Sequence, residues 1–344
     1  MTTTTAARTD AAVRTETGTA LPAPGRVLTG DRPTGGLHLG HYFGTLANRV
    51  RLQRQGCELF VVVADYQVFT DRDRPVSLPA LRTAMVLDYL ACGIDPDNSV
   101  IFAHSAVPAL NQLLVPFLSL VSTGELDRNP TVKEEIRTAG RSSVSGLMMT
   151  YPVHQAADIL FCKAELVPVG KDQLPHLELT RSIARRFNER YGPVFGLPEG
   201  LLGEVGTLLG LDGRKMSKSL GNGIALSDSP DEVAAKIRGA RTDSGRRISY
   251  QPQNRPEVAN LLTLAGLCQG VDPVLIAERI GTGGAAELKR VVTDSVNDLL
   301  APIRARRAGY RACDAVEILR RGAGLAREIA DATLAEVNTA MNMG

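Results

Sequence analysis

Tryptophan is absent from this chain of 344 residues, and aromatic side chains make up only 4% of it. Cysteine is also scarce, and the five cysteines lie far apart, without a CxxC pair or a Cys/His spacing typical of zinc. This pattern favours a reducing, cytoplasmic setting and argues against a structural zinc ion. The cysteines are Cys57, Cys92, Cys162, Cys268 and Cys313.

Long apolar runs are missing as well. No run approaches the roughly 20 residues that a bilayer-spanning helix needs, so no membrane role is expected. Residues 1–25 are rich in Thr and Ala and lack the apolar stretch of a secretory signal, and we expect them to form a disordered leader. The formal net charge of +2 creates no chain-wide field for nucleic acid, so any RNA contact must use local patches of Arg and Lys.

The composition that is present, 44% hydrophobic and 22% charged, is that of a globular protein with enough length for two domains. From Arg26 onward, short β-rich runs alternate with helical stretches, which is the βαβ pattern of a parallel sheet. We expect strands at 27–28, 59–64, 100–103 and 166–169, and helices at 39–52, 79–92 and 173–188. The prediction is an α/β fold with a doubly wound, Rossmann-like parallel sheet over residues 26–228.

The strand pattern stops after about Pro230, where segments 256–268, 285–300 and 323–341 show helical periodicity. We therefore expect a smaller, all-helical second domain over 229–344. Six arginines in it could contact RNA phosphates or form a solvated basic face. They are Arg304, Arg306, Arg307, Arg311, Arg320 and Arg321.

A glycine-rich turn, TGDRPTGGLHLGH at 29–41, lies between an expected strand and an expected helix. Glycines let the backbone approach a phosphate, and the first helical turn offers unpaired N–H groups at the positive end of a dipole. His38 and His41 fall on one face of that turn, where each could donate a ring N–H to a phosphate. Two histidines at this spacing could equally bind a metal or occupy a surface.

A second short motif, KMSKS at 215–219, has glycines on both sides and is expected on a mobile loop. Lys215 and Lys218 could close over a polyanion and stabilise a leaving pyrophosphate. A solvated loop is the alternative for such a Lys/Ser run. The two motifs together, in this order, are much more specific than either alone.

The pair HLGH and KMSKS resembles the two hallmark motifs of class I aminoacyl-tRNA synthetases. The stretch 146–188 and Gly124-Glu125-Leu126 resemble the matching regions of bacterial tryptophanyl-tRNA synthetases, and the similarity runs from about Arg26 to the C-terminus. The resemblance implies ATP- and Mg²⁺-dependent activation of L-tryptophan to tryptophanyl-adenylate, followed by transfer to tRNA(Trp). It also implies a homodimer and an anticodon-binding role for the helical domain.

The resemblance also assigns the site residues. His38, His41, Lys215 and Lys218 would be catalytic. Asp158 would accept a hydrogen bond from the indole N–H, although a helix cap or a core ion pair is an alternative for this residue. ATP would contact Thr29, Gly30, Arg32, Gly40, Gly170, Asp172, Met216 and Ser217, and the amino acid would contact Leu28, Gln67, Tyr151, Gln155, Asp158, Val169 and Gln173. His176 and Glu178 also match, but on an amphipathic helix we expect them to be structural.

Several residues depart from the family pattern at the expected pocket. His154 and Gln155 stand where Leu and Met are typical, Gln67 where His is usual, and Arg32 where Gln is usual. Gln155 with Asp158 resembles the helix face that tyrosyl enzymes of the archaeal type use to hold a phenol, so tyrosine is the alternative substrate. We expect the altered pocket to mark an auxiliary synthetase that tolerates tryptophan-mimicking inhibitors.

Two readings from other classes stay open. One is a small-molecule ligase or nucleotidyltransferase that shares the HxGH fold but uses no tRNA. The other is a tryptophan-sensing regulatory paralogue.

Overall fold

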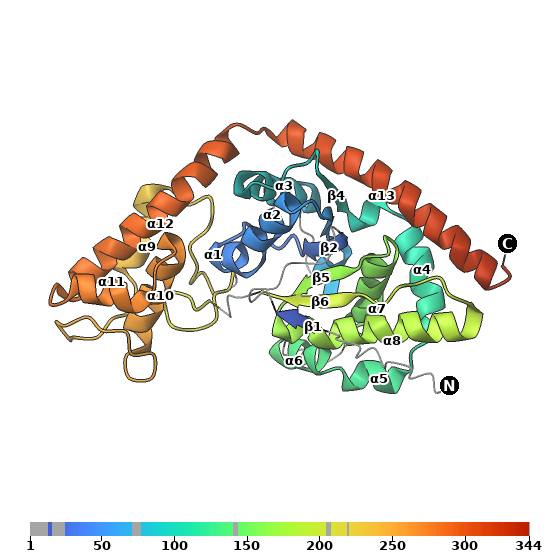
Figure 1. Cartoon of the computed structure of the whole chain (residues 1–344), viewed down its shortest axis with the longest axis horizontal. Helices are drawn as coiled ribbons and strands as arrows, with labels where there is room; N and C mark the ends of the chain where they lie inside the picture. Colours follow the sequence, from blue (N-terminus) through green and yellow to red (C-terminus); the bar gives the residue numbers. More distant parts are fainter. Residues whose placement is uncertain are drawn as a thin grey trace, which may run out of the picture.

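The computed structural model describes residues 13–15, 25–70, 77–139, 144–203, 208–218 and 220–343. Its centre is a six-stranded, all-parallel sheet in the order β1-β6-β5-β2-β3-β4, which confirms the predicted doubly wound architecture (Figure 1). The strands are β1 (Val13–Thr15), β2 (Arg26–Asp31), β3 (Glu58–Val63), β4 (Ser99–Ala103), β5 (Leu166–Val169) and β6 (Glu199–Leu202).

Alternating side chains of the central strands feed two separate cores. In β3, Leu59, Val61 and Val63 belong to one apolar cluster, whereas Phe60 and Val62 belong to the other. The first cluster takes in α2 (Ala47–Arg54) and α3 (Leu78–Cys92) on one face of the sheet. The second takes in α4 (Ala109–Leu118), α7 (Gly146–Leu160) and α8 (Leu174–Tyr191) on the other. Two smaller helices, α5 (Thr123–Arg128) and α6 (Pro130–Ala139), precede α7.

The helix expected at 39–52 is interrupted. It consists of α1 (Leu39–His41), a π-helical turn over Tyr42–Leu46, and then α2. Such turns are rare and often occur at functional sites, and this one directly follows the second motif histidine.

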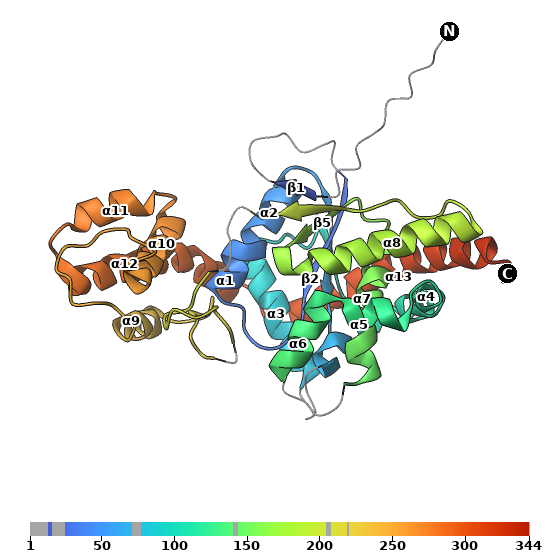
Figure 2. The same ribbon diagram turned by 90° about the horizontal axis from the view of Figure 1, so that it is seen from below.

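After residue 230 the described chain is helical, as predicted. The helices are α9 (Pro230–Arg238), α10 (Pro256–Gln269), α11 (Pro273–Ile280), α12 (Gly284–Ala308) and α13 (Ala312–Ala340). Helices α9 to α12 form a lobe to one side of the sheet (Figures 1 and 2).

Helix α13, the last part of the helical domain expected over 229–344, leaves this lobe and packs on the sheet domain. A Cβ added at Gly322 would lie 2.0 Å from the Ile101 carbonyl oxygen, which shows how closely α13 approaches β4. Further along α13, the Thr333 hydroxyl donates to the Phe161 carbonyl over 2.7 Å. A helical period predicts a helix but not its partner, and here the partner is the other domain.

The predicted leader, 1–25, lies largely outside the described residues. Its described part differs from the expectation of disorder, because Val13–Thr15 pair in parallel with β6, with Val13 opposite Gly200. These three residues are too few for a periodic pattern to show in the sequence.

Among the described helices, none alone is long and apolar enough to cross a membrane. Helices α10 and α11 meet that test only as a pair, with a bend of 110° between them.

Candidate active site

The first motif lies where β2 ends and α1 begins. His38 caps α1, and its Nδ1 accepts from the Gly40 backbone N–H over 3.1 Å. The His38 backbone N–H in turn donates to His41 Nδ1 over 3.3 Å. Because both Nδ1 atoms accept, each neutral ring carries its hydrogen on Nε2. The motif therefore holds two Nε2–H donors side by side, with ring centroids 3.9 Å apart.

Both motif histidines are neutral near pH 7. Burial, the His41 ring and the Lys218 charge lower the pKa of His38 to about 3. Burial also lowers the pKa of His41 to about 4, although the Asp31 carboxylate acts in the opposite direction. Neutral rings can donate to phosphate oxygens, but they add no positive charge, which must come from lysine.

Two glycines of the first motif, Gly30 and Gly40, are also required by the packing of the protein itself. A Cβ at Gly30 would lie 2.2 Å from the Val62 carbonyl oxygen, and a Cβ at Gly40 would lie 2.9 Å from His38 Cε1. Gly30 thus lets β2 approach β3, and Gly40 makes room for the capping imidazole.

The second motif is shaped by Asn222. Its side chain accepts from the Ser217 backbone N–H over 2.9 Å and donates to Asp212 over 2.7 Å and to the Lys215 carbonyl over 3.2 Å. Met216 is buried, while the Lys215 side chain is exposed. The last residue of the motif, Ser219, lies outside the described residues.

Backbone hydrogen bonds bring the two motifs together. Leu39 N donates to Ile224 O over 3.0 Å, and Leu226 N donates to Leu37 O over 2.9 Å. Lys218 Nζ lies across the first loop and donates to the Gly35 carbonyl over 3.0 Å. The structure therefore places the Lys218 charge beside the two motif histidines, as a shared phosphate site requires.

An ion pair between Asp31 and the buried Arg49 lies at the start of the first loop. The Asp31 carboxylate accepts from Arg49 over 2.6 Å and from the Tyr89 hydroxyl over 2.7 Å. Burial alone would raise the pKa of Asp31, but the charge and hydrogen bond of Arg49 outweigh it and lower the pKa to about 2. Sequence analysis missed this support, since a single Asp before a loop and a single Arg in a helix carry no pattern.

A second carboxylate links the first loop to the helical lobe. Asp88 Oδ2 accepts from the Leu37 backbone N–H over 2.9 Å, and Asp88 Oδ1 lies 3.2 Å from Arg307 Nε. Nearby, Arg306 Nε donates to the Ala91 carbonyl over 2.7 Å. Burial raises the pKa of Asp88. The end of α12 is thus fixed to the residue that precedes His38.

The other arginines considered for RNA binding also have partners in the chain. Arg311 and Arg320 pair with acids three residues away on their own helix. Arg304 donates to the Asp228 carbonyl and Arg321 pairs with Asp97. This favours a structural role for the basic stretch over a ready phosphate-binding surface.

Three of the residues assigned to the amino acid lie in or directly after strands of the sheet. Leu28 lies in β2 and Val169 ends β5, and these two strands are neighbours on either side of the point where the strand order reverses. Open α/β sheets bind ligands at such a switch point. Gln67 follows β3 in a short 3-10 turn, Tyr66–Thr70, and is buried.

The segment after β5 forms a tight turn. Gly170 begins it, and its carbonyl accepts from the Gln173 backbone N–H over 3.0 Å. A Cβ at Gly170 would lie 2.6 Å from Asp172 Oδ1, so a larger residue here would require the Asp172 side chain to move. Across the site, Arg32 lies after β2, with its guanidinium 3.3 Å from Thr70 Oγ1, while Thr29 is buried within the strand.

His176 joins two of the assigned pocket residues. The Tyr151 hydroxyl lies 3.1 Å from His176 Nε2, and His176 Nδ1 lies 3.0 Å from Gln155 Oε1. Because an amide oxygen only accepts, Nδ1 carries the hydrogen and Nε2 accepts from Tyr151. Burial lowers the pKa of His176 to about 4, so the ring is neutral. The expected structural role of His176 is consistent with this geometry.

Asp158 is only 2% exposed and faces a residue that sequence analysis did not name. Its Oδ1 lies 2.7 Å from Nδ1 of His104, which is fully buried in the turn that follows β4. The close contact with buried His104 therefore agrees with the core ion pair that was the alternative for Asp158. His104 directly follows the predicted strand 100–103, and this position could have identified it as a candidate site residue.

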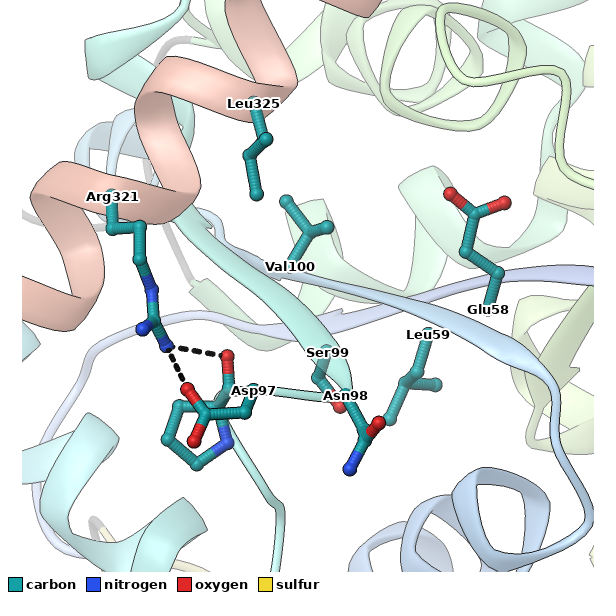
Figure 3. Close-up of a pocket in the computed structure, with 9 residues that line it drawn as sticks. Glu58, Leu59, Asp97, Asn98, Ser99, Val100, Arg321 and Leu325 are labelled. Carbon is teal, nitrogen blue, oxygen red and sulfur yellow. Dashed lines mark hydrogen bonds and ion pairs between the residues drawn. The ribbon is translucent and has the colours of Figure 1, made fainter.

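One cavity, of about 390 Å³, lies away from these residues (Figure 3). It is at the opposite edge of the sheet, at the beginnings of β3 and β4, and Arg321 and Leu325 of α13 cover it. It contains none of the assigned site residues. Within the described ranges, no group of three or more His, Cys, Asp or Glu side chains could hold a metal ion.

Comparison with known proteins gives a consistent family. Residues 22–301 match the family model described as tRNA synthetases class I (W and Y). The chain is 43% identical to a tryptophan–tRNA ligase of Treponema pallidum over 327 residues, 92% of this chain and 97% of the relative. It is 42% identical to the corresponding ligase of Streptococcus agalactiae, with the same two coverages.

Solved structures agree. The tryptophanyl-tRNA synthetase of Campylobacter jejuni, complexed with ADP and tryptophan, matches with a TM-score of 0.79 and 31% identity over 92% of this chain and 99% of that one. The Mycoplasma pneumoniae enzyme matches with a TM-score of 0.80 and 30% identity over 93% and 98%. A tyrosyl-tRNA synthetase of Archaeoglobus fulgidus, 23% identical, shares the fold. The chain therefore belongs to the class I tRNA synthetases of the tryptophan and tyrosine group, and within that group to the tryptophan–tRNA ligases.

Proposed function

We infer that this chain activates L-tryptophan with ATP and transfers it to tRNA(Trp), releasing pyrophosphate and AMP. The observation that carries the proposal is the joining of the two motifs, in which Lys218 lies across the loop that ends in His38 and His41. Three groups that can contact phosphate oxygens thus share one place at the carboxyl ends of the strands.

In the first step, a carboxylate oxygen of tryptophan attacks the α-phosphorus of ATP in line. The bond from that phosphorus to the bridging oxygen breaks, and pyrophosphate leaves with the electron pair. His38 and His41 donate from Nε2, while Lys215 and Lys218 supply positive charge to the departing oxygens. In the second step, the 2′-hydroxyl of the terminal tRNA ribose attacks the aminoacyl carbonyl and AMP leaves.

The remaining ATP contacts in this proposal surround those four residues. They are Thr29, Gly30, Arg32, Gly40, Gly170, Asp172, Met216 and Ser217. Mg²⁺ would accompany the nucleotide and neutralise phosphate charge. The nearest motif carboxylate, Asp31, is already paired with Arg49, which fits a metal held by phosphates and water rather than by a protein cluster.

The amino-acid side of the proposal depends on Asp158 as the acceptor for the indole N–H. Leu28 and Val169 supply apolar contact, and Gln67, Tyr151, Gln155 and Gln173 supply polar contact. Tyrosine is not the favoured substrate, because the curated relatives above are tryptophan–tRNA ligases. A buried acceptor discriminates strongly against ligands that cannot pair with it.

The proposal also includes a homodimer, an RNA-binding role for the helical lobe and a cytoplasmic setting. The five cysteines are free, and three of them are buried, which fits a reducing compartment. A tRNA-independent ligase and a tryptophan sensor remain the alternatives to be separated by experiment.

The test is ATP–pyrophosphate exchange with each standard amino acid, followed by aminoacylation of tRNA(Trp). We expect exchange with tryptophan alone, lost in Asp158→Ala and in Lys215→Ala but kept in Lys163→Ala, a lysine paired with Glu336 on the surface. Exchange driven by tyrosine would overturn the specificity. Exchange without tRNA charging would favour a sensor, and no exchange would favour the unrelated ligase.

A further inference from the structure

The Asp158 carboxylate lies in a setting that requires a compensating group. It is almost completely buried, and a carboxylate removed from water is costly unless a donor or positive charge faces it. His104 Nδ1 lies 2.7 Å from Asp158 Oδ1. Neither atom has a hydrogen-bond partner within the described part of the chain, so the two side chains face each other in a close electrostatic contact.

His104 is held firmly in this place. It begins the short turn His104–Ala106, directly after β4. The next residue, Ser105, donates its backbone N–H to the buried Asp65 carboxylate over 3.0 Å. The Tyr66 ring packs edge-on against the His104 ring, with centroids 5.4 Å apart. The Ser105–Asp65 hydrogen bond and the Tyr66 ring therefore restrict movement of the imidazole away from the carboxylate.

The neighbouring His154 cannot take over the same task. Its Nε2 lies 3.0 Å from Asn111 Oδ1, which only accepts, so Nε2 carries the hydrogen. Burial lowers the pKa of His154 to about 4, so the ring is neutral and its Nδ1 has no hydrogen to give. Of these two tilted rings, whose centroids lie 3.8 Å apart, only His104 can present an N–H to Asp158.

We propose that His104 is a positioning residue for indole recognition: it holds Asp158 by Oδ1, so that Oδ2 is presented to the indole N–H of tryptophan. This inference rests on the proposed role of Asp158 as the indole acceptor. It predicts that His104 acts on discrimination between ligands with and without a ring N–H. It does not act on phosphate chemistry, which takes place at the HLGH and KMSKS motifs.

The experiment compares tryptophan with β-(3-benzothienyl)alanine, in which sulfur replaces the indole N–H. The quantity is the ratio of their kcat/KM values in ATP–pyrophosphate exchange. We expect His104→Phe, which keeps a ring but no nitrogen, to lower this ratio about tenfold. The loss should come from tryptophan alone, while the sulfur analogue is activated as in the wild type.

Two variants serve as controls. His104→Asn, whose side-chain amide nitrogen takes the δ position of Nδ1, should keep the ratio within about threefold of the wild type, and His154→Phe, which removes the adjacent buried imidazole, should keep it within about twofold. If the phenylalanine variant at 104 does not fold, His104→Leu gives the same test, because its side chain also lacks an N–H.

The outcomes separate the two proposals. An unchanged ratio in His104→Phe, with the ratio lost in Asp158→Ala, would overturn the role of His104 and leave the acceptor role intact. Equal losses for tryptophan and the analogue in His104→Phe would show a merely structural residue and would also overturn it. An unchanged ratio in Asp158→Ala would show that Asp158 is not the indole acceptor. The proposed positioning role of His104 would then be overturned as well.

Discussion

The backbones of His38 and Ala225 form an antiparallel bridge, the shortest possible piece of sheet, between the first motif and the segment that follows the second. The bridge is flanked by the Leu39–Ile224 and Leu226–Leu37 hydrogen bonds. The segment that follows the KMSKS motif is thereby anchored to the residue that caps α1.

Replacing Lys218 with alanine should lower kcat for ATP–pyrophosphate exchange by about 100-fold, because it removes the positive charge lying across the first loop. The melting temperature should change little, since the Lys218 side chain is partly exposed and its ammonium donates to Thr34 and Gly35 on the first loop. Steady-state exchange and thermal melting check this. Lys163→Ala is the matched surface control, and an equal loss in that variant would contradict the assignment.

Four histidines, three buried and one half-buried, should make the protein less stable in mild acid. Their folded pKa values are about 3 for His38 and about 4 for His41, His154 and His176, all below the unfolded value near 6.5. The unfolded chain therefore binds protons first, so stability is complete above about pH 6.5 and falls as the pH drops towards 4.

Urea unfolding at pH 7.5 and pH 5 measures this effect. The free energy of unfolding should fall between the two values, and His154→Phe should remove about 2 kcal/mol of that fall, the share of one ring at pH 5. Only the pH dependence is compared, so any general loss from the substitution cancels. An identical pH dependence in the variant would show that His154 is not buried in its neutral form.

The packing of α13 on the sheet can be tested with two glycines of the same helix. Gly322→Ala would place a Cβ 2.0 Å from the Ile101 carbonyl oxygen and should destabilise the fold by about 2 kcal/mol. Gly324→Ala meets nothing within 4 Å and should stabilise it by about 0.5 kcal/mol through helix propensity. Denaturant midpoints compare the two, and equal effects would mean that α13 does not lie on β4.

The altered pocket should change inhibitor sensitivity. We expect the purified chain to tolerate an indole-containing tryptophan mimic better than a synthetase with His at the position of Gln67, and Gln67→His should lower the inhibitory concentration about tenfold. Asn111→Ala, which removes the hydrogen-bond acceptor of His154, is the comparison. Ordinary sensitivity in the unmodified chain would refute the auxiliary, inhibitor-tolerant interpretation.

The sequence predicted the parallel sheet and both motifs because these depend on local patterns: alternating strands and helices, and histidines and lysines at fixed spacing. It could not predict that α13 returns to cover β4, since helical periodicity does not name a partner. Gly322 was the local sign, but glycine within a helix has several possible causes. His104, Arg49 and Asp88 were missed because each gains its meaning only from a residue distant in the chain.

Asp88 connects the first loop with the helical lobe. One of its oxygens receives the backbone of Leu37 and the other faces Arg307 at the end of α12. A single side chain thus sets both the seating of the helical lobe and the entry of the chain into the turn that holds His38. A shift of that lobe would therefore be transmitted through Asp88 to the residue next to His38.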